Sequence, residues 1–234
     1  MVSQQQLETI RVAILDDHQS TIDGYSFRLR EHENIKVVAT ARFGSEIEGI
    51  LAENEVDLLV LDISMPTSEE DSNPYPLLYM LPKLREQYPD TAILIISMHK
   101  HRSLMRALMN AGAKGYILKD DRKAILQLGD IITSVAAGGV YFSEQSYAVM
   151  ADNQSRDDDV KPLTPRQVQV LSLSAAYPDM STAKLADQLE IAPSTLRNLM
   201  SESYLRLGVR NRAAAIAKAR QLGLITPYPP DPIN

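Results

Sequence analysis

The feature of this sequence that most limits its fold is a regular alternation of short apolar runs and helix-length segments in the first 135 residues. The runs consist largely of Val, Ile and Leu and are too short for buried helices. Continuous apolar runs of this length are typical of strands that are buried on both faces of a sheet. They occupy residues 12–15, 36–40, 57–61, 92–96 and 115–118.

The segments between and after these runs predict helices, which cover residues 21–31, 45–53, 77–87, 103–111 and 123–137. Pro82 lies inside the third segment, and we expect it to interrupt or delay that helix because proline cannot donate a backbone hydrogen bond. Five strands that alternate with five helices predict an α/β fold with a doubly wound, five-stranded parallel sheet.

The chain changes character after residue 150. Residues 151–162 are acidic and nearly devoid of large apolar side chains, which indicates an exposed linker. The remaining pattern is helical: Thr164 and Gln167 have the spacing of a capping box, Ser181 and Asn211 suit later helix starts, and residues 193–207 place apolar side chains on one face. We expect a first domain over residues 8–138, a linker over 139–161 and a small all-α domain over 162–226.

The net charge changes sign between the two halves. Residues 1–160 carry a net charge of −10, whereas residues 161–225 carry 9 basic and 4 acidic side chains, a net charge of +5. The basic half is therefore a candidate for nucleic-acid binding, with chance surface charge as the alternative. The chain has no cysteine, which excludes disulfide scaffolds and thiolate metal sites. We find no secretory signal pattern and no membrane-spanning run, and expect a cytoplasmic protein.

Polar side chains stand at the carboxyl ends of the expected strands, which is the edge where doubly wound sheets bind ligands. They are Asp16, Asp17, Asp62, Ser97 and Lys119. Clustered carboxylates repel one another and favour a hard divalent cation, so these residues predict a Mg²⁺ site. A single strand-end carboxylate such as Asp62 suits a nucleophile toward a phosphoryl group, which Lys119 and Ser97 can then contact. Each residue alone is better explained as a turn residue or a solvated charge, but that explanation does not account for all five at matching strand ends.

Four motifs within residues 8–140 are specific in combination. They are Asp16-Asp17-His18, Asp62 followed by Met65-Pro66, Ser97-Met98-His99, and residues 111–116 leading to Lys119-Asp120. They resemble the receiver domain of bacterial two-component response regulators, which has a flavodoxin-like fold. The resemblance implies that Asp62 accepts a phosphoryl group from a sensor histidine kinase.

The same resemblance implies roles for the neighbouring residues. Asp17, Asp62 and the carbonyl of Ser64 would hold the metal, with Asp16 acting largely through water. Ser97 and Tyr116 would be the pair whose reorientation carries the signal to the outer face, unless Tyr116 is simply a core residue.

The sequence departs from the receiver pattern after Met65-Pro66. The acidic segment 67–76 is longer than the usual turn by about seven residues, and long loops of this kind are often functional. Its position beside Asp62 suggests an effect on metal access, kinase docking or the lifetime of the phosphoryl group. A tolerated surface insertion is the alternative.

The helices expected over residues 181–189 and 193–207 form a helix-turn-helix pattern. The outer side of the second helix carries Ser194, Arg197, Asn198, Ser201, Leu205 and Arg206. Arginine can read guanine and asparagine can read adenine in the major groove, while Ser194 and Thr195 can reach phosphates near the helix start. Arg210 and Arg212, just beyond the helix, suit contacts with the DNA backbone. A helical module that binds protein is the alternative.

Residues 163–166, 170–171, 194–197 and 207–212 resemble the LuxR-type DNA-binding domain over about residues 161–226. Together with the receiver motifs, they make the whole chain similar to a NarL/FixJ-type response regulator. Two departures stand out: Glu190 occupies the usual glycine position and Ala192 the usual helix-capping serine, whose loss costs about 1 kcal/mol in a generic helix.

We therefore expect a phosphorylation-dependent, DNA-binding transcription regulator that is not an enzyme. It would take a phosphoryl group from a sensor histidine kinase, bind promoter DNA and form a homodimer when active. One alternative is a phosphorelay adaptor whose helical domain binds protein. A second, an aspartate-nucleophile phosphatase, is disfavoured because Ser64 stands where such an enzyme has a second carboxylate. The chain also has no Gly-rich nucleotide loop, which disfavours a Rossmann dehydrogenase or a P-loop NTPase.

Overall fold

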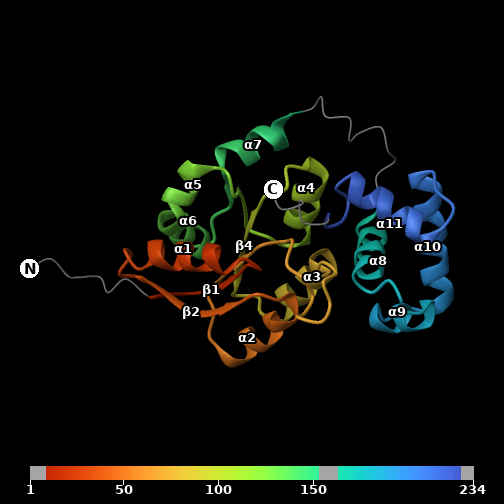
Figure 1. The fold of residues 1–234 in the computed structure, drawn as a ribbon, viewed down its shortest axis with the longest axis horizontal. Helices are drawn as coiled ribbons and strands as arrows, with labels where there is room; N and C mark the ends of the chain where they lie inside the picture. The colour runs from red at the N-terminus through yellow and green to blue at the C-terminus, as the bar shows by residue number, and fades with distance from the viewer. Residues whose placement is uncertain (1–8, 153–162, 228–234) are drawn as a thin grey trace, which may run out of the picture.

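The structure is a computed structural model that describes residues 9–152 and 163–227. It contains an α/β domain followed by a helical domain, which lie side by side in Figure 1. The second half of the expected linker, residues 153–161, lies outside the described residues, as does the end of the chain beyond residue 227.

The α/β domain is built on one parallel sheet with the strand order β2-β1-β3-β4-β5-β6. The five expected strands are present, but the sheet has a sixth, so the predicted number of strands is corrected from five to six. A two-residue strand is too short to show a periodic pattern, which is why the sequence did not reveal it. The strands are β1 (Ile10–Leu15), β2 (Ile35–Ala41), β3 (Leu58–Leu61), β4 (Ala92–Ser97), β5 (Gly115–Leu118) and β6 (Tyr141–Phe142).

Both faces of the sheet are buried because successive side chains of a strand point to opposite sides. In β1, Val12 and Ile14 belong to one hydrophobic cluster, whereas Ala13 and Leu15 belong to the other. The first cluster is covered by α1 (Gln19–Leu29), α5 (Arg122–Leu126) and α6 (Leu128–Ala136). The second is covered by α2 (Ile47–Glu53), which follows the short 3₁₀ turn Gly44–Glu46, and by α3 (Leu77–Gln87) and α4 (Arg102–Ala111).

Two helices differ from expectation. Pro82 does not interrupt α3, which runs unbroken over the predicted residues. Proline costs the helix one backbone bond, and the burial of Leu77, Leu81 and Leu84 outweighs that loss. The single helix expected over residues 123–137 is instead split into α5 and α6 at Gln127.

The first half of the expected linker packs on the α/β domain. Strand β6 pairs with β5, and α7 (Glu144–Ala151) follows it, capped by the hydroxyl of Ser143. Arg102 Nε of α4 donates to the carbonyl of Met150 at 3.0 Å. The sheet therefore gains an edge strand and a covering helix from residues that lay within the expected linker, 139–161.

The helical domain confirms the predicted caps. Thr164 and Gln167 form the capping box of α8 (Pro165–Ala176), while Ser181 caps α9 (Thr182–Gln188) and Asn211 caps α11 (Arg212–Gln221). Helix α10 (Pro193–Leu207) has Ala192 at its N-cap position and therefore lacks a side-chain cap, as its sequence predicts. Among the residues that the structure describes, no helix is long and apolar enough to cross a membrane.

The turn between α9 and α10 contains a strained residue. Glu190 has a φ of 54° and is the only non-glycine residue with positive φ in the described parts of the chain. This left-handed conformation costs an ordinary residue about 1–2 kcal/mol, whereas glycine adopts it freely.

We expect Glu190→Gly to stabilise the helical domain by about 1 kcal/mol, because the substitution removes this strain. Urea unfolding of the full chain, followed by circular dichroism, measures the effect. Glu190→Gln is the matched control, since it removes the charge but keeps the side chain. A glycine variant no more stable than the glutamine variant would show that the backbone is unstrained.

Candidate phosphoryl-transfer site and nucleic-acid interface

The predicted acidic cluster forms where the parallel strands end. Leu15 of β1 lies opposite Leu61 of β3, so the residues that follow them, Asp16 and Asp62, leave the sheet side by side. The backbone N–H of Asp62 donates to the carbonyl of Leu15 at 2.9 Å, which extends this pairing by one residue. The strand ends thus bring together residues 46 positions apart in the chain.

Lys119, which follows β5, bridges the two carboxylates. Its Nζ lies 2.6 Å from Oδ2 of Asp16 and 2.8 Å from Oδ2 of Asp62. The three side chains are only 14%, 2% and 5% exposed, respectively. The structure therefore joins strands β1, β3 and β5 in one buried ionic cluster, as the strand-end positions predict.

The charges of this cluster are not balanced. Burial raises the pKa of Asp16, and the negative charge of Asp62 raises it further, against the opposing effect of Lys119. Burial alone would lower the pKa of Lys119, but the charges of Asp62 and Asp16 outweigh it and raise the pKa above its ordinary value. One firmly charged ammonium thus faces two carboxylates, and the surplus negative charge favours a second cation.

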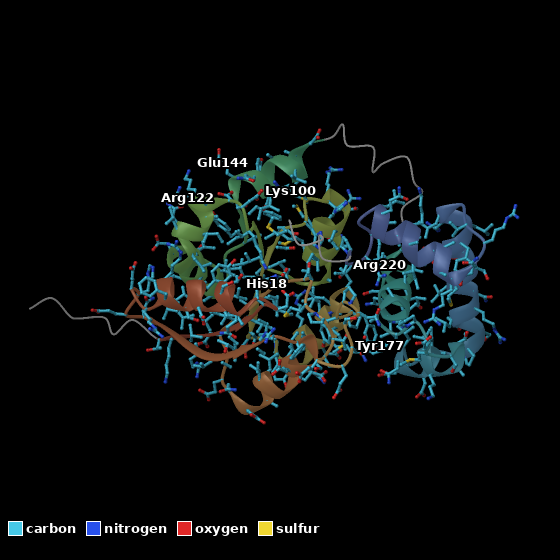
Figure 2. The ribbon with its side chains drawn as sticks, in the orientation of Figure 1. His18, Lys100, Arg122, Glu144, Tyr177 and Arg220 are labelled. Carbon is cyan, nitrogen blue, oxygen red and sulfur yellow. The ribbon has the colours of Figure 1, made fainter. Side chains whose placement is uncertain are left out.

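Potential metal ligands adjoin this cluster. Ligand atoms of Asp16, Asp17 and His18 all lie within 4.8 Å of one another. His18, labelled in Figure 2, is exposed and contacts Asp17 through Nδ1 at 2.7 Å. The N–H of Ser64 donates to Asp62 Oδ1 at 3.3 Å, which fixes this loop beside the carboxylate. Carboxylate and carbonyl oxygens are hard donors, so the residues present fit Mg²⁺.

Ser97 and Tyr116 are both fully buried. The Tyr116 hydroxyl donates to the carbonyl of His99 at 2.8 Å, and burial raises the pKa of this phenol, so it remains a donor. Tyr116 therefore has both a core position and a specific polar partner, and the two interpretations of this residue are compatible.

His99 belongs to the motif Ser97-Met98-His99, but its place in the sequence did not indicate the role it has at the site. The ring Nε2 of His99 lies 2.9 Å from the hydroxyl of Ser64, and its backbone N–H donates to the hydroxyl of Ser97 at 3.3 Å. Burial lowers the pKa of His99, which favours the neutral ring. His99 thus ties the loop after β4 to the loop after β3. This bond joins residues 35 apart, and no local sequence signal reports it.

The long acidic segment folds as a hairpin. Pro66 and Pro74 form an antiparallel bridge, Thr67 N–H donates to the carbonyl of Asn73 at 2.9 Å, and Tyr75 N–H donates to that of Met65 at 2.9 Å. We refer to residues 66–74 as the β3–α3 hairpin. Its base is anchored by Gly44, whose N–H donates to the Pro66 carbonyl at 2.9 Å. The hairpin is therefore an ordered part of the domain, and its role remains a prediction.

The predicted DNA-contacting residues divide into two groups. Along and just after α10, Ser194, Thr195, Arg197, Asn198, Ser201 and Arg210 are exposed, and Arg206 is half-buried. Arg212 lies elsewhere: it donates to the carbonyls of Met180, Ser174 and Tyr177 at 2.7, 3.1 and 2.6 Å. These bonds stabilise the turn after α8, so its guanidinium has a structural task that the sequence did not indicate.

We expect Lys119→Ala to destabilise the folded chain by about 3 kcal/mol at pH 7.5, because two buried carboxylates would lose their shared cation. The loss should shrink as the pH falls, since a buried acid with a raised pKa takes up a proton more readily in the folded than in the unfolded state. Mg²⁺ should recover about 1 kcal/mol at pH 7.5. Thermal unfolding across pH, with and without Mg²⁺, measures these effects.

Lys100→Ala is the matched control, because Lys100 forms an ion pair of similar length with Asp120, at 2.6 Å, on the surface. Exposed pairs of this kind contribute about 0–1 kcal/mol. Equal losses for the two variants at every pH would contradict the special role of Lys119.

Comparison with curated proteins finds relatives along nearly the whole chain. "Oxygen regulatory protein NreC" of Staphylococcus epidermidis is 28% identical over 226 residues, which cover 92% of this chain and 99% of the relative. "Transcriptional regulatory protein MctR" of Rhizobium johnstonii is 29% identical over 219 residues, which cover 93% and 96%.

Solved structures share the fold. RcsB of Salmonella enterica serovar Typhimurium, bound to promoter rprA in the presence of the phosphomimetic BeF₃⁻, superposes with a TM-score of 0.64 at 19% identity. The match covers 90% of this chain and 98% of the RcsB chain. At this identity the likeness establishes the fold alone.

Two family models together span most of the chain. The response regulator receiver domain matches residues 12–128, which is half of the sequence, and the luxR family of bacterial regulatory proteins matches residues 161–219. The first match lies within the α/β domain, and the second covers most of the helical domain. The chain therefore belongs to the bacterial response regulators that combine a receiver domain with a LuxR-type helix-turn-helix domain.

Proposed function

We propose that this protein is a transcription regulator whose DNA binding is controlled by phosphorylation of Asp62 by a sensor histidine kinase. The observation that carries the proposal is the buried cluster in which Lys119 contacts both Asp16 and Asp62 at the carboxyl edge of the sheet. The family assignment and the exposed face of α10 support the DNA-binding half of the proposal.

In the proposed reaction, a carboxylate oxygen of Asp62 attacks the phosphorus of a phosphohistidine on the kinase. The new P–O bond forms as the P–N bond breaks, and the imidazole leaves with a proton. The product is an acyl phosphate on Asp62. Lys119 then exchanges its contact with the carboxylate for a phosphoryl oxygen, and the Ser97 hydroxyl donates to another.

Asp17, Asp62 and the Ser64 carbonyl would hold Mg²⁺, with Asp16 acting largely through water. The ion, when bound, supplies positive charge to the phosphoryl oxygens. Asp16 and Lys119 fix the position of the Asp62 carboxylate before transfer, because both are buried and in contact with each other. The wall of this site is completed by His99, which holds Ser64 in place.

Phosphorylation would then shift the receiver between two conformations, with Ser97 and Tyr116 responding to the new group. The active form would be a homodimer that binds paired half-sites in promoter DNA. Arg197 and Asn198 on α10 would read bases, while Ser194, Thr195, Ser201, Arg206 and Arg210 would contact the backbone or adjacent bases. A protein that binds a sensor histidine kinase and promoter DNA would act in the cytoplasm, and in this role it would catalyse no reaction on a separate substrate.

We expect Asp62→Ala to abolish phosphoryl labelling by acetyl phosphate, because the substitution removes the carboxylate proposed to attack the phosphorus, which lies in contact with Lys119. Autoradiography or mass spectrometry of the intact chain measures the label. Asp130→Ala removes an exposed carboxylate of α6 and serves as the control that keeps full labelling. A labelled Asp62→Ala chain that is folded would reject the assignment.

We expect Arg197→Ala to weaken DNA binding by about tenfold to a hundredfold, since an arginine contact with a base is worth about 1–3 kcal/mol. Wild-type affinity should also fall steeply with salt concentration. The probe is a fragment selected by the wild-type chain from a pool of genomic DNA, and gel shifts measure its affinity.

Arg30→Ala is the matched control, because it removes an exposed arginine from the receiver domain. Equal affinity of the Arg197 and Arg30 variants would remove α10 from the DNA interface. Failure of the wild-type chain to retain any fragment would favour the protein-binding adaptor instead.

A further inference from the structure

The two domains meet on a surface that the proposed chemistry does not use. Tyr79 of α3 is only 4% exposed and belongs to the hydrophobic cluster of the helical domain, with Val170, Leu173, Leu185 and Leu189. Its hydroxyl donates to the carbonyl of Gln188, at the end of α9. A receiver side chain thus completes the core of the DNA-binding domain.

A second contact lies at the start of α4. The Ser103 hydroxyl is 2.9 and 3.0 Å from the carbonyls of Leu222 and Gly223, which follow α11. Gly223 has a φ of 61° and lies so close to the ring of His101 that no larger residue fits. The receiver therefore holds the DNA-binding domain at two separated points.

The β3–α3 hairpin faces the same domain. Its residues Asp71 and Asn73 line one side of a pocket of about 470 Å³, and the opposite side is formed by residues 176–181 and Lys184. Figure 2 places Tyr177 on the side of the DNA-binding domain that faces α3. This hairpin, which is longer than the family pattern, therefore lies opposite the turn after α8.

Helix α10, which carries the residues proposed to read DNA and is called the recognition helix below, lies on the side of the helical domain that faces away from α3. Helix α8 packs against both α3 and α10, and in Figure 1 it lies between them. Arg197 and Asn198 remain exposed in the presence of the docked receiver. Docking through α3 consequently leaves the residues that would read DNA uncovered.

The hairpin also links the docking contact to the phosphorylation site. It begins four residues after Asp62 and ends five residues before Tyr79. Its two ends are paired with each other through Thr67, and Met65 is paired with Tyr75. The loop beside Asp62 is therefore joined to the start of α3 by paired backbone rather than by a loose loop.

We propose that the β3–α3 hairpin and Tyr79 form a docking platform that couples Asp62 to the orientation of the DNA-binding domain while its recognition helix stays uncovered. This inference rests on the proposed function for the roles of Asp62 and α10. Phosphorylation acts on the relative position of the two domains, and thereby on how two chains place their recognition helices on paired half-sites, rather than by exposing a hidden helix.

The first test measures docking in the full chain. The sequence contains no cysteine, so Glu53→Cys and Ala217→Cys, both at exposed positions away from the contact, take a fluorescent donor and acceptor.

Tyr79→Ala should raise the undocked population about a hundredfold, because a buried ring is lost. Tyr79→Phe, which keeps the ring, should raise it about fivefold through the lost hydrogen bond. Tyr147→Ala, an exposed tyrosine of α7, should leave energy transfer unchanged. Wild-type transfer in a folded Tyr79→Ala chain would overturn the proposal.

The second test asks whether Asp62 controls docking. Acetyl phosphate with Mg²⁺ should change energy transfer in the labelled wild-type chain but not in Asp62→Ala. Unchanged transfer in a chain that mass spectrometry shows to be phosphorylated would overturn the coupling. A chain that takes no phosphoryl group would instead reject the proposed function, and the Tyr79 variants would still decide whether the platform exists.

The third test separates an uncovered helix from an occluded one. Unphosphorylated Tyr79→Ala should bind the selected DNA fragment within about threefold of wild-type affinity, since docking hides none of the reading residues. A gain of tenfold or more would show that the docked receiver covers the recognition helix, which would overturn the proposal. Absence of binding by both chains would refute the DNA-binding function and leave the docking measurements valid.

Discussion

The contact of one ammonium with two carboxylates organises the receiver domain. Lys119, Asp16 and Asp62 leave three different strands, and each is buried at a depth where an unpaired charge is costly. The parallel register of β1 and β3 brings the two acids side by side, and β5 delivers the cation. The arrangement on which the proposed phosphoryl transfer depends therefore requires the correct order of the strands, so the fold and the proposed chemistry share one constraint.

Most of the receiver and its site follow from the sequence because both are consequences of topology. Apolar runs predict buried strands, and parallel strands place their carboxyl ends at one edge, which locates Asp16, Asp62 and Lys119 without any coordinates. The relation between His99 and Ser64 does not follow, because it depends on how two loops pack. Strand β6 was not predicted because two residues show no periodicity. The predicted interruption of α3 at Pro82 was wrong because the burial of the helix outweighs the local helix propensity of proline.

The helical domain shows the same division. Its caps were predictable, since Thr164, Ser181 and Asn211 act on backbone groups only three residues away. The task of Arg212 was not, because its carbonyl partners lie 32 to 38 residues upstream and are assembled only by the fold. Nor does the pattern of Tyr79, an aromatic residue in an apolar helix, indicate that it packs into a neighbouring domain rather than its own. The sequence pattern predicts which face of α10 is exposed, but it does not predict contacts between residues that are far apart in the chain.

The packing of α7 against the receiver sets the length of the tether between the domains. With α7 ending at Ala151 and the first described residue of the next domain at Leu163, eleven peptide units separate Asp152 from Leu163, and their fully extended reach is about 38 Å. A connection this short keeps a released domain at an effective local concentration in the millimolar range. A contact too weak to hold two separate molecules together can therefore still be well populated within one chain, and small changes in its strength suffice to redistribute the two arrangements.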